Sequence, residues 1–162
     1  MKVIVSKGNR NIRLGEFFTS NGTIFDMAKP CDAEFLTARV ISGDAWSDFP
    51  GTYGGASIVV SERAKTVLDR FPGMDAFEFV KTMVPSFPDT CFWSLSNTLN
   101  VWQPVLEETE RFSPLYRLRK DFAVSGSHFA LDQQMYKVAS DELCEAFEAA
   151  GLVGFECVAC IY

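Results

Sequence analysis

The residues that could support catalysis are few and widely separated in this 162-residue chain. The sequence has one histidine, His128, so any Ser–His–acid triad must use it. Ser125 and Ser127 are its neighbours in sequence, but a triad forms in the folded protein, and no G-x-S-x-G motif is present. We expect His128 to occupy a surface or turn position, with a catalytic histidine as the alternative.

The five cysteines favour reduced, packed side chains over a disulfide framework or a metal site. They are odd in number and scattered through apolar sequence. Cys157 and Cys160 form a C-x-x-C motif in an apolar segment expected to be a strand, where the two side chains point to opposite faces. Zinc would need a second pair or nearby histidines. We therefore expect no metal and no cofactor.

The charge pattern argues against nucleotide and nucleic-acid ligands. The chain has a net charge of −6, which gives no electrostatic footprint for a phosphate backbone. The glycines of 51–55, "GTYGG", lack the spacing of nucleotide-binding loops, and the basic cluster at 116–120 is too small to indicate RNA or DNA. An acidic surface favours fast encounter with a basic partner. Alternatively, the charge serves only solubility.

Two acidic groups are the predicted contact residues. The first lies in the loop at 42–57, "SGDAWSDFPGTYGGAS", where aromatic residues alternate with acids and glycines. The alternative is that these aromatic side chains fold back and cap the core. The second is a short acidic piece after Leu106. The predicted contact residues are Asp44, Trp46, Asp48, Tyr53, Glu107, Glu108 and Glu110.

Two stretches, 56–84 and 135–162, predict strand–helix–strand units. In each, an apolar run is followed by a serine that can cap a helix, Ser61 or Ser140, and then by acidic residues in the first turn. Apolar residues at helical spacing follow each cap. Aligning the two serines indicates a weak internal repeat, although two common local patterns would also produce this likeness.

The remaining sequence predicts further strands within a single domain of residues 1–162. Strands or extended segments are expected at 2–7, 21–29, 91–102 and 115–124, whereas 33–41 fits a strand or a short helix. Residues 1–55 form the less regular N-terminal part. The fold class is α+β with a mixed β-sheet.

The hydropathy pattern predicts a cytoplasmic protein. No segment approaches the ~20 consecutive apolar residues that span a bilayer. The N-terminal residues lack the apolar core and cleavage site of a signal peptide. We expect no membrane partner.

Two stretches, "GGASIVVSERAKTVLDRF" and "YKVASDELCEAFEAAGLVGFEC", carry a family resemblance. Together with the "EF" strand after the first, they resemble bacterial immunity proteins of polymorphic toxin systems, in the group with a myxobacterial type member. The resemblance covers roughly residues 54–157 and rests mainly on capping and packing residues. It implies a small cytoplasmic, non-catalytic protein that binds a cognate toxin and blocks its active site or substrate groove.

Two other classes of function remain open. One is a small-ligand-binding protein or enzyme with an aromatic-lined pocket, which a metabolite retained through purification would favour. The other is a non-catalytic subunit of a larger assembly.

Overall fold

The structure is a computed structural model that describes residues 1–53, 58–108, 115–122, 126–134 and 136–162. Within these residues the chain forms two mixed β-sheets and two α-helices, which confirms the predicted α+β class. The strands are β1 (Lys2–Ser6), β2 (Arg13–Thr19), β3 (Leu36–Ser42), β4 (Gly51–Thr52), β5 (Val59–Ser61), β6 (Glu78–Met83), β7 (Phe92–Ser96), β8 (Trp102–Gln103), β9 (Phe129–Asp132), β10 (Lys137–Ala139) and β11 (Phe155–Ala159). The helices are α1 (Glu62–Leu68) and α2 (Asp141–Ala149), with 3-10 turns at Met74–Ala76 and Thr98–Asn100.

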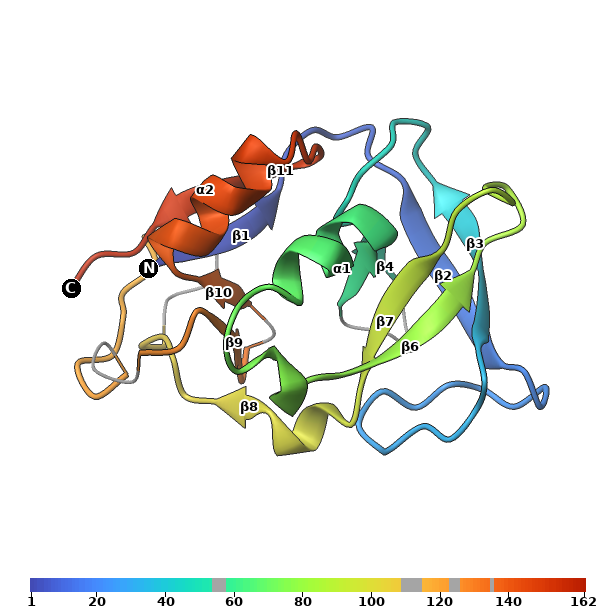
Figure 1. Ribbon diagram of the computed structural model, residues 1–162, viewed down its shortest axis with the longest axis horizontal. Helices are drawn as coiled ribbons and strands as arrows, with labels where there is room; N and C mark the ends of the chain where they lie inside the picture. The colour runs from blue at the N-terminus through green and yellow to red at the C-terminus, as the bar shows by residue number, and fades with distance from the viewer. Residues whose placement is uncertain (54–57, 109–114, 123–125, 135) are drawn as a thin grey trace.

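The two sheets lie on either side of α1 (Figure 1). One sheet has five strands in the order β11-β1-β10-β9-β8, and the other has six in the order β4-β2-β3-β6-β7-β5. In the view of Figure 1, α2 lies across β1 and β11. The largest core cluster contains residues of both helices and of both sheets, so it joins the two halves of the molecule.

Both helices begin at the predicted serine caps with nearly the same backbone geometry. Ser61 has φ −69° and ψ 163°, and its hydroxyl accepts a hydrogen bond from the N–H of Ala64 at 3.1 Å. Ser140 has φ −68° and ψ 162°, and its hydroxyl accepts from the N–H of Leu143 at 3.2 Å. Each serine therefore satisfies one of the free N–H groups at the start of its helix.

The two strand–helix–strand units also share a sheet arrangement. β5 and β6 both pair antiparallel with β7, which lies between them. β10 and β11 both pair antiparallel with β1, which again lies between them. In each unit the helix thus connects two parallel strands that are separated by one antiparallel strand, the arrangement of a split β-α-β motif.

The strand predicted at 21–29 is wrong, because these residues form no regular strand. The strand nearest to them in sequence is β2, which ends at Thr19. Only Ile24 bridges back to the chain, opposite Phe18. The register of β2 against β3 shifts between Gly15 and Phe18, and Glu16 within this irregularity has φ 56°. The bulge interrupts the alternation of buried and exposed residues by which a strand is read from sequence.

The segment predicted as extended at 115–124 forms no regular strand in its described residues, where Arg117 and Leu118 make isolated bridges. The sequence prediction also missed β9. All four residues of β9 are buried, so no alternation marks this strand. The ambiguous segment 33–41 contains most of β3.

Candidate functional site

The predicted contact loop is fixed to the edge of the six-stranded sheet by backbone hydrogen bonds. The N–H of Ile12 donates to the carbonyl of Ala45 at 2.9 Å, and the N–H of Tyr53 donates to the carbonyl of Leu14 at 2.8 Å. The N–H of Asp44 also donates to the Arg10 carbonyl at 2.9 Å. These hydrogen bonds hold the backbone of the described part of the loop against β2 and the residues before it.

Asp44 lies at the surface in an ion pair with Arg10. The guanidinium Nε is 2.9 Å from Oδ1 and Nη2 is 2.5 Å from Oδ2, so the pair is bidentate. Both side chains are mostly exposed, at 64% for Asp44 and 75% for Arg10. The hydrogen bonds from Arg10 lower the pKa of the Asp44 carboxyl. Asp44 is thus exposed in one orientation, with its charge paired to that of Arg10.

Tyr53 is also exposed and belongs to a small patch on the outer face of β2 and β3. Its hydroxyl is 3.2 Å from Nη1 of Arg13, whose guanidinium lies 5.5 Å from the ring centroid. A methyl group at Gly15 would lie 2.6 Å from Cγ1 of Ile41 and 3.5 Å from the Tyr53 carbonyl, so Gly15 lets these residues approach over β2. We call Arg13, Ile41 and Tyr53 the sheet-face patch; Ile41 is 41% exposed and Tyr53 is 52% exposed.

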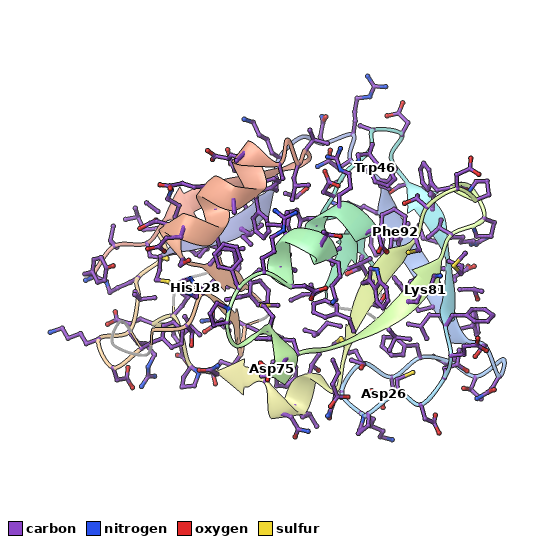
Figure 2. The ribbon with its side chains drawn as sticks, viewed as in Figure 1. Asp26, Trp46, Asp75, Lys81, Phe92 and His128 are labelled. Carbon is purple, nitrogen blue, oxygen red and sulfur yellow. The ribbon has the colours of Figure 1, made fainter. Side chains whose placement is uncertain are left out.

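Trp46 folds back onto the core, as the alternative interpretation of the loop predicted. Its ring centroid is 5.4 Å from that of Phe87 and 5.3 Å from that of Phe92. Figure 2 shows Trp46 beside Phe92, at the end of the molecule away from His128. The indole is partly buried, so it packs against the core and also keeps some accessible surface.

Asp48 must be removed from the predicted contact surface, because its side chain is fully buried. Its Oδ1 accepts a hydrogen bond from the Ser61 hydroxyl at 2.5 Å. Its Oδ2 accepts from Nη2 of Arg63 at 2.9 Å and from the N–H of Val153 at 2.8 Å. Three donors within the chain therefore satisfy this carboxylate, and a partner cannot reach it.

The contacts of Asp48 join the two strand–helix–strand units. Its backbone N–H donates to the carbonyl of Val153, and its carbonyl accepts from the N–H of Ser61, both at 2.9 Å. Arg63, at the start of α1, also donates to the carbonyl of Gly151 after α2 at 2.9 Å. We call this set of contacts the Asp48 joint.

The second predicted acidic group lies on the side of the five-stranded sheet. Glu107 is exposed and forms an ion pair with Arg117 at 3.3 Å. Glu108 is exposed, and Glu110 lies outside the described residues. Glu107 follows Leu106, which bridges Leu118, whereas the 42–53 loop attaches to β2 of the other sheet. The structure therefore does not bring the two acidic groups together on one sheet.

A cluster around Glu62 was not predicted. Oε2 of Glu62 accepts hydrogen bonds from Sγ of Cys91 at 2.7 Å and from Nε1 of Trp93 at 2.6 Å. These bonds lower the pKa of the Glu62 carboxyl, while burial and the Glu62 carboxylate raise the pKa of the Cys91 thiol to about 11. Because only a thiolate is a strong nucleophile, this cysteine is a poor one at neutral pH.

The Glu62 cluster borders an open depression of about 290 Å³ that also includes Lys81. No local pattern marks this cluster, because Glu62 and Cys91 are 29 positions apart in the sequence. In the sequence, Glu62 has the ordinary role of an acidic residue in the first turn of a helix. The pairing of β5 with β7 brings the two residues together.

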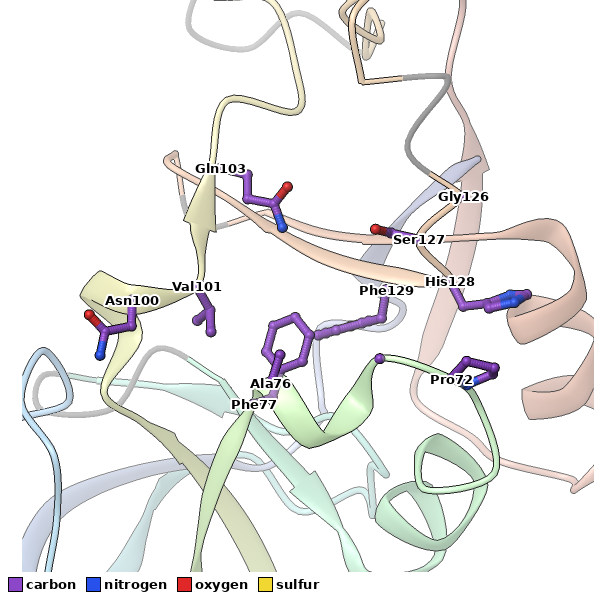
Figure 3. Close-up of a pocket in the computed structure, with 11 residues that line it drawn as sticks. Pro72, Ala76, Phe77, Asn100, Val101, Gln103, Gly126, Ser127, His128 and Phe129 are labelled. Carbon is purple, nitrogen blue, oxygen red and sulfur yellow. The ribbon is translucent and has the colours of Figure 1, made fainter.

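A larger pocket of about 390 Å³ lies between the turn after α1 and the edge of the five-stranded sheet (Figure 3). Phe77 and Phe129 form its apolar wall, with their ring centroids 5.1 Å apart. Asn100 and Gln103 supply polar groups. Two aromatic rings therefore line this pocket.

His128 borders this pocket but turns its ring away from Phe129 towards α2 (Figure 3). Its Nδ1 lies 3.0 Å from the hydroxyl of Ser140, the cap of α2. The imidazole also packs edge-on against Phe71, with ring centroids 5.1 Å apart. The hydroxyl of Ser140 also accepts the N–H of Leu143, so its contact with His128 joins the residues before β9 to the start of α2.

The C-x-x-C cysteines face different core clusters, as expected for a strand. Cys157 packs against the largest core cluster, which includes Cys144. Cys160 belongs to the cluster on the other face of the five-stranded sheet. All five cysteines are free. In the described part of the chain, no group of three or more His, Cys, Asp or Glu side chains is arranged to hold a metal ion.

No protein-family model matches this chain, and no curated protein or solved structure is significantly similar to it. The described residues contain no helix with the length and apolar character required to cross a membrane.

Proposed function

We propose that this protein is an immunity protein that binds a cognate bacterial toxin in the cytoplasm and blocks the toxin's active site or substrate groove. The proposal rests on the resemblance of residues 54–157 to that family and on one structural observation. The sheet-face patch presents three exposed side chains, Arg13 on β2, Ile41 on β3 and Tyr53 directly after β4. Tyrosine and arginine are enriched among the residues that dominate binding energy in protein interfaces.

The acidic surface supports a basic partner. The net charge of the chain is −6, and the bidentate Arg10–Asp44 pair orients one carboxylate on the loop that leads to Tyr53. A toxin that acts on nucleic acid or another anionic substrate carries positive charge in its groove, and acidic side chains can occupy that groove in place of the substrate. An interface of roughly 1,200–2,000 Å² would cover such a groove.

The groups considered for catalysis support a binding role. His128 contacts the cap of α2 and the ring of Phe71. The Cys91 thiol is held by Glu62 with its pKa raised to about 11. In the described residues these groups stabilise the fold, and the exposed patch is left for contact with a macromolecule.

Growth protection in cells that express the adjacent toxin domain tests this proposal. Wild-type protein should restore growth, and Tyr53→Ala should lose protection at low expression, because loss of a dominant interface residue weakens binding by about thirtyfold or more. Tyr162→Ala is the matched control, since Tyr162 is also an exposed tyrosine, at 75%, and lies outside the sheet-face patch. It should protect like wild type.

A charge reversal tests the acidic part of the surface separately. Asp44→Lys should weaken protection, whereas Asp69→Lys should not; Asp69 is the 53% exposed aspartate directly after α1 and pairs with Lys65. If Tyr53→Ala and Asp44→Lys both protect as well as wild type, the contact surface lies elsewhere. If wild-type protein gives no protection, the immunity function is wrong.

A small-ligand-binding role is the second candidate, favoured by the pocket between Phe77 and Phe129. Native mass spectrometry of the purified protein would detect a retained metabolite. Ala76 lines the pocket, so Ala76→Trp should fill it and abolish the added mass. If the wild-type protein carries no mass beyond that of its own chain, this role is contradicted.

A further inference from the structure

The pocket between Phe77 and Phe129 has a lining without permanent charge. Its volume is about 390 Å³, a size that is typical of small-ligand sites. The described residues that line it include no aspartate, glutamate, lysine or arginine, and the ring of His128 turns away towards α2 (Figure 3). An ionised ligand would therefore lose hydration in this pocket without gaining an ion pair. The net charge of −6 makes an anion still less favourable.

Gln103 and Ser127 supply polar groups from opposite sides of the pocket. Gln103 belongs to β8, and Ser127 precedes β9. Figure 3 shows both side chains directed into the space above the rings of Phe77 and Phe129. Neither the amide of Gln103 nor the hydroxyl of Ser127 has a hydrogen-bond partner among the described residues. Since each group can both donate and accept a hydrogen bond, both remain available to a ligand.

The two phenylalanine rings supply the apolar wall of the pocket. Their planes meet at 71°, with the centroids 5.1 Å apart. Phe129 is 4% exposed, whereas Phe77 is only partly buried and keeps accessible surface. An aromatic ligand can pack edge-to-face or offset against such a surface. The pocket therefore combines a wall for a ring with an amide that can pair with an adjacent donor and acceptor.

We propose that this pocket binds a neutral aromatic ring that carries a carboxamide or lactam group. The ring packs against Phe77, and the N–H and carbonyl of the ligand pair with the carbonyl and N–H of the Gln103 amide. Ser127 bonds a further polar substituent on the opposite side. This inference rests on the second candidate function, the small-ligand-binding role, and names the class of ligand for the same pocket. It does not depend on toxin binding.

A titration with benzamide, followed through the backbone N–H signals of Phe77 and Val101 in ¹H–¹⁵N spectra, tests the class of ligand. Both residues line the pocket. Their signals should shift saturably with a dissociation constant on the order of 1 mM, the strength expected of so small a ligand. The signal of Tyr53, in the sheet-face patch, should stay in place.

Two analogues of benzamide separate its charge from its hydrogen bonds. Benzoate has nearly the same shape but is an anion, and it should bind at least about tenfold more weakly, because the pocket offers it no cation. Acetophenone keeps the ring and the carbonyl but lacks the N–H donors, and it should also bind more weakly than benzamide.

Gln103→Met is the decisive variant, because methionine keeps the length of the side chain and removes its donor and acceptor. Benzamide should bind about tenfold more weakly, the effect of losing two hydrogen bonds between neutral groups. Gln134→Met is the matched control, at an exposed glutamine outside the pocket, and should bind like wild type. Ala76→Trp should abolish the shifts by filling the pocket. An unchanged Tyr53 signal shows that a variant is folded, and the partly exposed Gln103 keeps the test valid if Ala76→Trp is not.

The proposal is overturned if benzamide does not bind the wild-type protein, or if benzoate binds as tightly as benzamide. It is also overturned if Gln103→Met, or a folded Ala76→Trp, binds benzamide like wild type. These results differ from a failure of the small-ligand role itself. If mass spectrometry finds a metabolite on the wild-type protein and not on Ala76→Trp, while benzamide does not bind, the pocket keeps its role and the proposed class of ligand is wrong.

Discussion

Asp48 makes polar contacts with both strand–helix–strand units. Its carboxylate accepts three hydrogen bonds, from Ser61, Arg63 and Val153, and its backbone makes two more. Two of the three side-chain bonds come from the start of α1 and one from the turn after α2. Loss of the charge would therefore loosen both units at once.

We predict that Asp48→Asn lowers the free energy of unfolding by about 2 kcal/mol, since hydrogen bonds to a charged group are lost and an amide donor faces other donors. Asp44→Asn is the matched control at an exposed ion pair and should cost less than about 0.5 kcal/mol. Urea denaturation of both variants measures this difference. Equal destabilisation would show that Asp48 has no special structural role.

Lys137 should make stability depend on pH. Burial holds its pKa in the folded state below the ordinary value of 10.5, so between these two pKa values the unfolded chain binds more protons than the folded chain. Stability then rises with pH in this window, by at most about 1.4 kcal/mol per pH unit, and falls as the pH is lowered through it.

Lys137→Met should lack this slope and should be at least as stable as wild type at neutral pH, because no buried amine remains. Urea denaturation of both proteins from pH 7 to pH 10.5 gives the comparison. Parallel curves would mean that the amino group is solvated in the folded protein.

At the scale of elements, the turn after α2 is fixed against the contact loop by Gly154. This glycine has φ +86°, and a methyl group there would lie 2.2 Å from Oγ and 2.8 Å from Cα of Ser47. Gly73 has nearly the same φ, +85°, but a methyl group there would have no neighbouring atom within 4 Å. The pair therefore separates the cost of backbone strain from the cost of steric contact.

Gly73→Ala should cost about 1 kcal/mol, from the left-handed conformation alone. Gly154→Ala should cost about 2 kcal/mol more, because the loop must move away from the turn. Thermal unfolding of the two variants under the same conditions measures the difference. If both variants melt at the same temperature, the loop and the turn are not closely packed.

The elements that could be predicted from sequence are those with local signals. Ser61 and Ser140 mark the starts of the two helices, because a serine side chain can cap a helix. The apolar runs before these serines form strands. β2 and β9 were missed because a bulge at Glu16 breaks one alternation and burial on both faces hides the other. The insertion of β7 and β1 between the strands of the two units is a non-local pairing, which no local pattern records.

The candidate site could be predicted only in part. Asp44 and Asp48 look alike in the sequence, four positions apart in one loop, and the burial of Asp48 is set by Ser61 and Val153, which are distant in the chain. Lys137 was missed because its environment is set by strand pairing with Ile4 and Leu131. In each case the chemical type of the residue was visible and its surroundings were not.

At the scale of the whole molecule, the fold consists of two sheets joined through a shared core and the Asp48 joint. The sheet-face patch lies on the six-stranded sheet, whereas Lys137 belongs to the five-stranded sheet. The proposed immunity function requires that the protein act by occupying the toxin, so its effect should be limited by stoichiometry.

Titration of the purified toxin domain with this protein tests the central proposal most directly. The residual activity of the toxin should fall linearly with added protein and reach its minimum at one equivalent, as expected when a tight inhibitor covers an active site. Full toxin activity at a large excess of the protein would contradict toxin binding. Complete inactivation by a small fraction of an equivalent would show instead that the protein is an enzyme that acts on the toxin.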